Sequence, residues 1–151
     1  MLDLEAELDA LIGALSRAGI EYAVCGGLAM AIHGKPRATI DIDLLIQPAD
    51  EERVYPAVEP LGFRIKAKPM NFAGGTMQIR RVTKIDSDGD TLMLDLLLVT
   101  PMYEHVWRTR YEVEWRDHMV CVVSREGLVA LKSSRSSKQD LADIERLEGE
   151  E

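Results

Sequence analysis

The strongest constraint on the fold is a stretch in which two glycines are followed by two aspartates at alternating positions. An apolar strand ends at Gly26-Gly27, a short apolar helix follows and ends near Gly34, and a second strand alternates acidic and aliphatic residues. Side chains at positions i and i+2 of a strand share one face, so we expect Asp41 and Asp43 to project together, roughly 6 to 7 Å apart. Leu45 shares that face, which indicates a covered face, and covered carboxylates require protons, basic partners or a metal ion.

A third carboxylate interrupts an apolar segment farther along the chain. Residues 91–99 form a near-continuous apolar run, typical of a strand buried on both faces, and Asp95 lies in its middle. Burying a lone carboxylate costs several kcal/mol unless it is paired or bound to metal. Three carboxylates on two strands are therefore expected to share a hard divalent cation. The alternative for Asp41 and Asp43 is the solvated face of an edge strand, where charge is favoured.

This arrangement resembles the signature of the nucleotidyltransferase superfold, which includes DNA polymerase beta and the small minimal nucleotidyltransferases. That signature is a hydrophobic strand, a glycine pair, a short spacer, Asp-x-Asp and a third acidic residue on a nearby strand. The matching residues here are Gly26, Gly27, Asp41, Asp43 and Asp95. The longer segment 37–43, Arg-Ala-Thr-Ile-Asp-Ile-Asp, is most similar to the AbiEii-type branch of abortive-infection toxins.

In the AbiEii-type branch, a later cluster of basic and acidic residues heads a helix. The similar residues here are Lys132, Arg135, Lys138 and Asp140. One extra residue, Gln139, separates Lys138 from Asp140, which departs from the family pattern and leaves the roles of both open.

The resemblance implies an α/β (α+β) fold with a mixed, mostly antiparallel sheet flanked by helices. It also implies a reaction, transfer of a nucleoside monophosphate from a nucleoside triphosphate such as ATP to an acceptor hydroxyl, with release of pyrophosphate. Two Mg²⁺ ions, with Mn²⁺ as the alternative, would clamp the attacking and leaving oxygens. Asp41, Asp43 and Asp95 are then the catalytic and metal-binding residues, and Asp95 binds the ion that activates the acceptor.

The same resemblance assigns nucleotide contacts. The backbone N–H groups of Gly26 and Gly27, at the start of a helix, would hold the β- and γ-phosphates. The other expected nucleotide-binding residues are Arg37, Thr39 and Lys132. Each has an ordinary alternative: an ion pair with a nearby acid for the arginine, a β-forming residue for the threonine, and a solvated helix end for the lysine.

Two other functional classes fit the same pattern. The chain could be a non-catalytic nucleotide-binding or regulatory module that acts through a partner as a toxin–antitoxin component. The enzyme itself could also be a toxin–antitoxin component, and in either case the expected protein partner is an antitoxin or a second copy of the chain in a homo-oligomer. The chain could also be an antibiotic nucleotidyltransferase with a small-molecule acceptor, although the small size disfavours this class, because such enzymes usually carry an additional acceptor-binding domain. Retention of three carboxylates favours an active enzyme. The acceptor class, whether RNA or tRNA, protein or small molecule, stays open.

Length and composition predict a single soluble domain. The 151 residues fit one nucleotidyltransferase-like domain spanning 1–151, and no apolar run approaches the ~20 residues of a membrane span. The first residues do not resemble a signal peptide, so we expect a cytoplasmic protein without membrane contact. Cys25 and Cys121 are isolated in apolar strands and are expected to be buried free thiols.

Charge is unevenly distributed. The net charge of −8 argues against broad binding to nucleic acid or anionic membranes. However, residues 60–85 contain no acid and six basic residues: Arg64, Lys66, Lys68, Arg80, Arg81 and Lys84. They predict either a solvated strand face or a local surface for triphosphate or an RNA acceptor.

The remaining elements follow from periodicity and turn residues. Helices are expected at 2–17, 49–61, 126–132 and 140–147, with a conflict at Pro56 and a Ser-rich break at 133–137. Strands are expected at 21–24, 63–66 and 76–85, besides those named above. Asp88-Gly89 predicts a hairpin turn, and a second hairpin is expected between 111–115 and 119–123.

Overall fold

The computed structural model describes residues 2–34, 41–135 and 138–148. In these residues, eight strands form one sheet in the order β3-β5-β6-β2-β1-β8-β7, and β4 pairs with β5. The strands are β1 (Ala23–Cys25), β2 (Asp41–Ile46), β3 (Phe63–Lys66), β4 (Met70–Phe72), β5 (Met77–Ile85), β6 (Thr91–Leu98), β7 (Tyr111–Trp115) and β8 (His118–Val122). Among the described strands, only β2 with β6 and β1 with β8 pair in parallel, so the expected mixed, mostly antiparallel sheet is confirmed.

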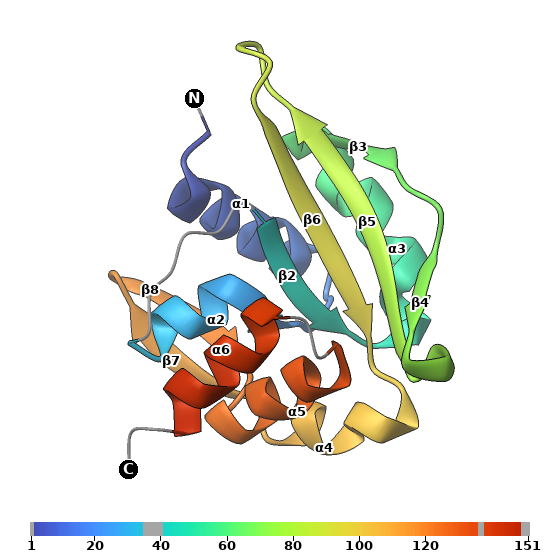
Figure 1. Ribbon diagram of the computed structural model, residues 1–151. Helices are drawn as coiled ribbons and strands as arrows, with labels where there is room; N and C mark the ends of the chain where they lie inside the picture. The colour runs from blue at the N-terminus through green and yellow to red at the C-terminus, as the bar shows by residue number, and fades with distance from the viewer. Residues whose placement is uncertain (1, 35–40, 136–137, 149–151) are drawn as a thin grey trace.

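Helices cover the sheet on two sides (Figure 1). The α-helices are α1 (Leu4–Arg17), α2 (Gly26–Ile32), α3 (Glu51–Val58), α4 (Glu104–Arg108), α5 (Arg125–Arg135) and α6 (Lys138–Glu148). Helices α1 and α3 lie behind β2, β6 and β5 in Figure 1, whereas α2, α5 and α6 lie in front. Side chains of β2 and β6 that point to the front of the sheet therefore lie on the same side as α2 and α5.

The register of the central strands follows from their apolar runs. Ile42, Leu44 and Ile46 of β2 are fully buried, and six consecutive residue pairs join β2 to β6. In a parallel pair these facing residues lie on the same side of the sheet. The register pairs Asp43 with Asp95, which places two of the predicted carboxylates side by side.

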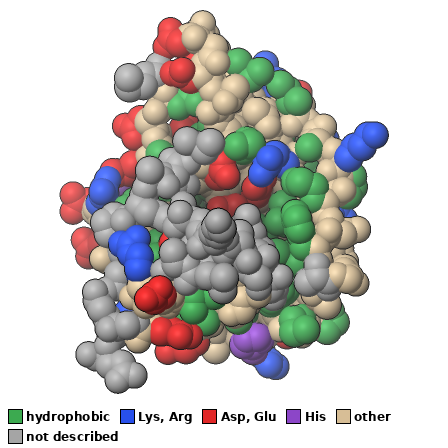
Figure 2. Space-filling view, in the orientation of Figure 1, with side chains coloured by type: hydrophobic (Ala, Val, Ile, Leu, Met, Phe, Trp, Pro, Cys, Tyr) green, Lys and Arg blue, Asp and Glu red, His purple; other side chains and the backbone are tan. Residues whose placement is uncertain are grey.

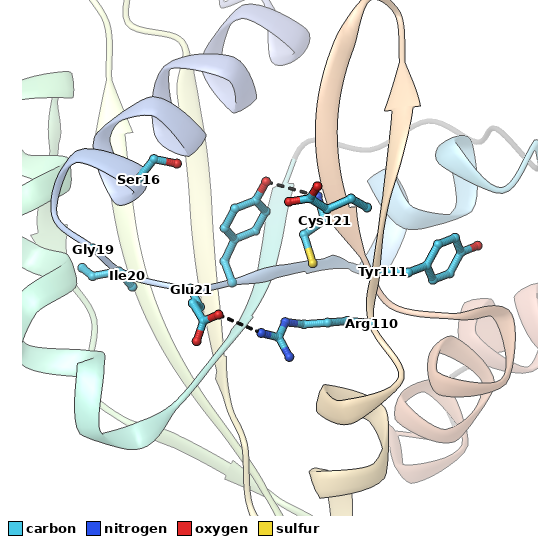
Figure 3. A pocket seen from close by; sticks show the side chains of 9 residues that line it. Ser16, Gly19, Ile20, Glu21, Arg110, Tyr111 and Cys121 are labelled. Carbon is cyan, nitrogen blue, oxygen red and sulfur yellow. Dashed lines mark hydrogen bonds and ion pairs between the residues drawn. The ribbon is translucent and has the colours of Figure 1, made fainter.

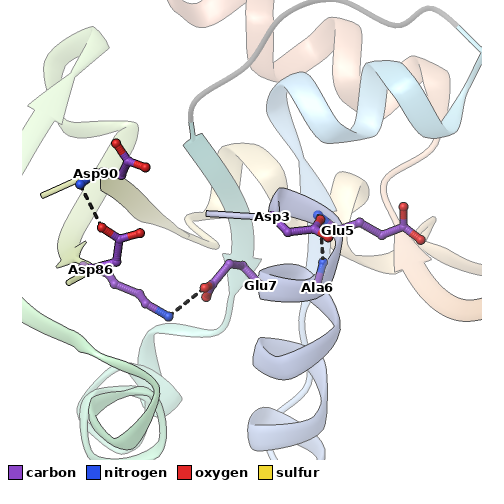
Figure 4. Close-up of polar contacts among 7 residues, drawn as sticks. Asp3, Glu5, Ala6, Glu7, Asp86 and Asp90 are labelled. Atoms are coloured by element: carbon purple, nitrogen blue, oxygen red, sulfur yellow. Dashed lines mark hydrogen bonds and ion pairs between the residues drawn. The ribbon is translucent and has the colours of Figure 1, made fainter. Parts of the chain in front are cut away.

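Helix α1 is fixed by its cap and its apolar stripe. The Asp3 carboxylate accepts hydrogen bonds from the backbone N–H groups of Glu5 and Ala6, at 3.1 and 3.2 Å (Figure 4). Its buried residues, Leu8, Leu11, Ala14 and Leu15, recur at helical spacing. On the same side of the sheet, Lys84 of β5 donates to Glu7 of α1 at 2.7 Å.

Two expected elements differ from the structure. Pro56 lies inside α3, which continues to Val58 before a 3₁₀ turn at Glu59–Leu61, so the proline does not end the helix where it occurs. The predicted Ser-rich break starts too early, because α5 continues to Arg135. Strand β4 was missed, since three residues are too few to show alternation.

In the described part of the chain, every helix is too short or too polar to cross a bilayer.

Candidate functional site

Three aspartates lie on the front face of the two parallel central strands. Asp43 of β2 faces Asp95 of β6 in the register, and Asp41 precedes Asp43 by two residues on the same face. Asp95 is 5% exposed, whereas Asp41 and Asp43 are half-buried. Figure 2 shows acidic side chains in a recess near the centre of this face, beside a basic side chain. The alternative of a solvated edge strand is therefore wrong, because β2 lies between β6 and β1.

Arg81 of β5 occupies the next position in this row. Its Nε donates to Oδ1 of Asp95 at 2.7 Å and its Nη2 donates to Oδ2 at 2.9 Å. This two-point hydrogen bond to Asp95, helped by the charges of Asp41 and Asp43, raises the pKa of Arg81 above its ordinary value although burial opposes the shift. The guanidinium therefore compensates part of the negative charge of the three carboxylates.

The other predicted basic residues do not join Arg81. Arg80, its neighbour in β5, points to the opposite face and lies 3.5 Å from Glu51 of α3. Lys66 lies over the ring of Tyr55, also on α3, at 3.7 Å from its centre. The expectation of one basic surface that includes both Arg80 and Arg81 is therefore wrong, because alternation along β5 separates them.

Gly26 forms the wall of the recess next to Asp43. Its φ of +66° lies in the left-handed region, and a Cβ at this position would lie 2.0 Å from Oδ2 of Asp43. No other residue type can occupy this position without moving the carboxylate. Gly26 of the predicted glycine pair thus packs directly on Asp43 of the predicted Asp-x-Asp, at the point where β1 changes into α2.

Lys132 of α5 lies close to the same wall. It is 4% exposed and its Nζ lies 2.9 Å from Oδ2 of Asp143, which is fully buried on α6. Lys132, Asp43, Gly26 and Cys25 line one small cavity between the sheet and α5. The alternative of a solvated helix end is therefore wrong for Lys132.

The remaining predicted residues are not all placed. Arg37 and Thr39 lie outside the described residues, as do the side chains of Arg135, Lys138 and Asp140. Asp143 was missed by sequence reasoning, although a signal existed: it lies four residues before the buried Leu147, on the inward face of α6. An acid on that face required a basic partner.

The carboxylates at this site are of the chemical type that binds a divalent cation, although among the described residues it is Asp86, Asp88 and Asp90 that bring three ligand atoms within 4.8 Å of one another. The carboxylate oxygens on β2 and β6 are hard ligands of the kind that Mg²⁺ prefers, and they lie on one face of these two adjacent strands. Because Gly26 has no Cβ, the Asp43 carboxylate fits beside it. Each carboxylate oxygen has two lone pairs, so Asp95 can accept from Arg81 and still bind an ion.

Two other features lie away from this recess. Asp86, Asp88 and Asp90 bring carboxylate oxygens within 4.8 Å of one another in the β5–β6 turn, where Oδ1 of Asp86 accepts from the backbone N–H of both others. These contacts shape the predicted hairpin turn, and Figure 4 shows the one between Asp86 and Asp90. A cavity of about 620 Å³ lies between the end of α1 and β7–β8, where Arg110 pairs with Glu21 at 3.2 Å (Figure 3).

A scan against protein-family models found no match, and a search of curated proteins found none. Solved structures are similar over nearly the whole chain. The lincosamide antibiotic adenylyltransferase LnuA, bound to lincomycin, has a TM-score of 0.63 at 16% identity, covering 95% of this chain and 96% of LnuA. The antibiotic-resistance factor ANT(2'')-Ia has a TM-score of 0.67 at 14% identity, covering 94% and 80%. An antigenic nucleotidyltransferase-like protein from Paracoccidioides brasiliensis has a TM-score of 0.56 at 20% identity, covering 93% and 74%.

These similarities show the fold, which is that of the nucleotidyltransferases, as the carboxylate pattern predicts. The placement in the AbiEii-type branch stays a prediction.

Proposed function

We propose that this protein is a metal-dependent nucleotidyltransferase that moves a nucleoside monophosphate from a nucleoside triphosphate to an acceptor hydroxyl. The observation that carries this proposal is the row formed by Asp43 and Asp95 in register, with Asp41 on the same face and Gly26 packed against Asp43. The fold shared with nucleotidyltransferases supports it.

Asp41, Asp43 and Asp95 would hold two Mg²⁺ ions, with Mn²⁺ as the alternative. When bound, such ions supply charge stabilisation to the attacking and leaving oxygens of an in-line displacement. Asp95 also accepts the proton of the acceptor hydroxyl in this scheme. Arg81 orients Asp95 through its two hydrogen bonds, so the carboxylate keeps one rotamer before and during the reaction.

The triphosphate would lie between α2 and α5. Backbone N–H groups of Gly26 and Gly27 bind the β- and γ-phosphates, and the ammonium of Lys132 opposes their charge. Arg37 and Thr39 belong to the same proposal through the family resemblance alone.

For the acceptor, we favour a small molecule over RNA. LnuA was solved with lincomycin and ANT(2'')-Ia with adenylyl-2''-tobramycin, and both share the fold over more than nine-tenths of this chain. The net charge of −8 also disfavours a polyanionic acceptor.

The single-domain organisation, the cytoplasmic location, the homo-oligomer and the toxin role with an antitoxin partner remain predictions from the sequence.

The test is transfer of label from each α-labelled nucleoside triphosphate, with Mg²⁺ or Mn²⁺, to three acceptor pools: small molecules, total RNA and protein. Asp43→Asn should reduce transfer about a hundredfold or more, equivalent to ~2.7 kcal/mol of transition-state stabilisation. Asp90→Asn in the β5–β6 turn removes the same charge away from the site and should leave transfer unchanged.

The outcomes separate the functional classes. Label in small molecules supports the antibiotic-modifying type, and label in RNA or protein supports the toxin type. Metal-dependent nucleotide binding without transfer to any pool would contradict the enzyme proposal and support a non-catalytic module.

A further inference from the structure

A buried ion pair joins the last two described helices beside the carboxylate row. Nζ of Lys132 and Oδ2 of Asp143 are 2.9 Å apart, and the two side chains are 5% and 0% exposed. Removing two charges from water is costly, and apolar residues of similar size often replace such pairs without loss of stability. A contribution to stability is therefore a weak explanation for the presence of this ion pair.

The two helices have other contacts that hold them together. Leu131 of α5 and Leu147 of α6 belong to the buried core. Arg125 also donates from Nη2 to the backbone oxygen of Leu147 at 3.2 Å. The α5–α6 packing thus has contacts besides the ion pair, and the distinctive effect of the pair is to hold the lysine side chain in one place.

The lysine side chain that is held in this way lies next to the carboxylate row. Lys132 lines the same small cavity as Gly26 and Asp43, with the apolar side chains of Met77, Leu97 and Leu128 completing the wall. An ammonium on a flexible four-carbon stem loses side-chain entropy when it binds phosphate. A buried carboxylate that holds it in place beforehand removes part of that cost.

We propose that Asp143 is a positioning residue that fixes the Lys132 ammonium beside Gly26 and Asp43, where it binds the terminal phosphates of the triphosphate substrate. This inference rests on the proposed function and extends it to Asp143 on α6. Asp143 acts only through Lys132 and does not itself contact phosphate.

The experiment compares three variants with the wild type by two measurements. The variants are Asp143→Asn, Lys132→Met and the apolar double variant Lys132→Met/Asp143→Leu, all made in the full chain. The first measurement is the melting temperature without ligand. The second is calorimetric binding of inorganic tripolyphosphate with Mg²⁺, which tests phosphate recognition independently of the base, followed by ATP with Mg²⁺.

We expect stability and binding to separate. Lys132→Met alone should lower the melting temperature, because Asp143 is left buried without its cation, whereas the double variant should recover most of it. The double variant should bind tripolyphosphate at least tenfold more weakly than wild type, and Asp143→Asn should weaken binding several-fold although Lys132 is present. Because Asp143 acts through Lys132, adding Asp143→Leu to Lys132→Met should weaken binding no further.

A matched control is the pair Lys84–Glu7, which has the same type of contact at 2.7 Å on the opposite face of the sheet. Lys84→Met/Glu7→Leu should bind tripolyphosphate as wild type does. Wild-type affinity in Lys132→Met/Asp143→Leu would overturn this inference and leave the proposed function standing. Absence of any tripolyphosphate or ATP binding by the wild type, with Mg²⁺ or Mn²⁺, would overturn both.

Discussion

Arg81 and Asp95 form a two-point ion pair across neighbouring strands, at 2.7 and 2.9 Å, within a row of three aspartates. The guanidinium also interacts with the charges of Asp41 and Asp43, so it offsets part of the negative charge of all three carboxylates. Two consequences for stability follow, one for the arginine and one for the ion.

The first prediction concerns Arg81→Met. Removing the guanidinium takes away two charge-assisted hydrogen bonds and leaves three carboxylates on one face, so unfolding free energy without divalent ions should fall by about 2 to 3 kcal/mol. Mg²⁺ offsets the same charge, so it should stabilise the variant more than the wild type. Thermal unfolding with Mg²⁺ and with chelator measures both effects.

Arg80→Met is the matched control, because Arg80 lies on the opposite face and pairs with Glu51. Its stabilisation by Mg²⁺ should equal that of the wild type. If Arg81→Met and Arg80→Met respond equally to Mg²⁺, the carboxylate row is not the site of the ion.

Much of the site could be predicted because its signals are local. Alternation placed Asp41 and Asp43 on one face, and the uninterrupted apolar run placed Asp95 in a buried strand. The strand pairing that joins them is a long-range relationship. The sequence predicts that carboxylates must meet, but the register of β2 with β6 is needed to show that Asp43 and Asp95 are the facing pair.

The charge partners could not be predicted in the same way. Arg80 and Arg81 are adjacent and chemically identical, and only the register of β5 on β6 decides that Arg81 faces Asp95. Asp143 meets Lys132 only because α6 packs back on α5. Local patterns identify which charges need partners, whereas tertiary packing selects the partner.

A second prediction follows from Lys66, which was expected to help form a phosphate-binding surface. Its ammonium lies over the Tyr55 ring, a cation–π contact at a partly exposed position. Lys66→Ala should therefore cost about 0.5 to 1 kcal/mol of unfolding free energy. Binding of tripolyphosphate should not change, because Lys66 contacts α3 on the far side of the sheet. The exposed Lys68, changed to Ala, provides the baseline for both measurements.

A third prediction uses the two thiols, which were both expected to be buried: Cys25 is buried, whereas Cys121 is only half-buried, so the expectation was wrong for Cys121. Burial raises the pKa of the Cys121 thiol, while the nearby Arg110 lowers it by a smaller amount. Because the folded chain binds this proton more tightly than the unfolded chain, the contribution to stability is present below the ordinary thiol pKa and is lost as the pH rises through the folded value.

Alkylation of native protein at pH 8 should be slow at Cys121 and slower at the buried Cys25. Arg110→Met should slow the alkylation of Cys121 further, because it removes the charge that lowers the thiol pKa. Faster alkylation of that variant would contradict this role of Arg110.

The last prediction concerns Gly26→Ala. The new methyl group would meet a carboxylate oxygen of Asp43 at 2.0 Å, on a residue whose φ is +66°. The backbone strain costs about 1 kcal/mol, and relief of the clash requires Asp43 to move away from the face that it shares with Asp95. Gly89→Ala separates the two effects, because Gly89 has a φ of +85° but meets nothing within 4 Å. Both variants should lose about 1 kcal/mol from strain, whereas Gly26→Ala should lose more and should also lose Mg²⁺ stabilisation and nucleotidyl transfer. Equal stability losses, with transfer intact in both, would show that Gly26 serves only the turn from β1 into α2 and that Asp43 does not need its present position.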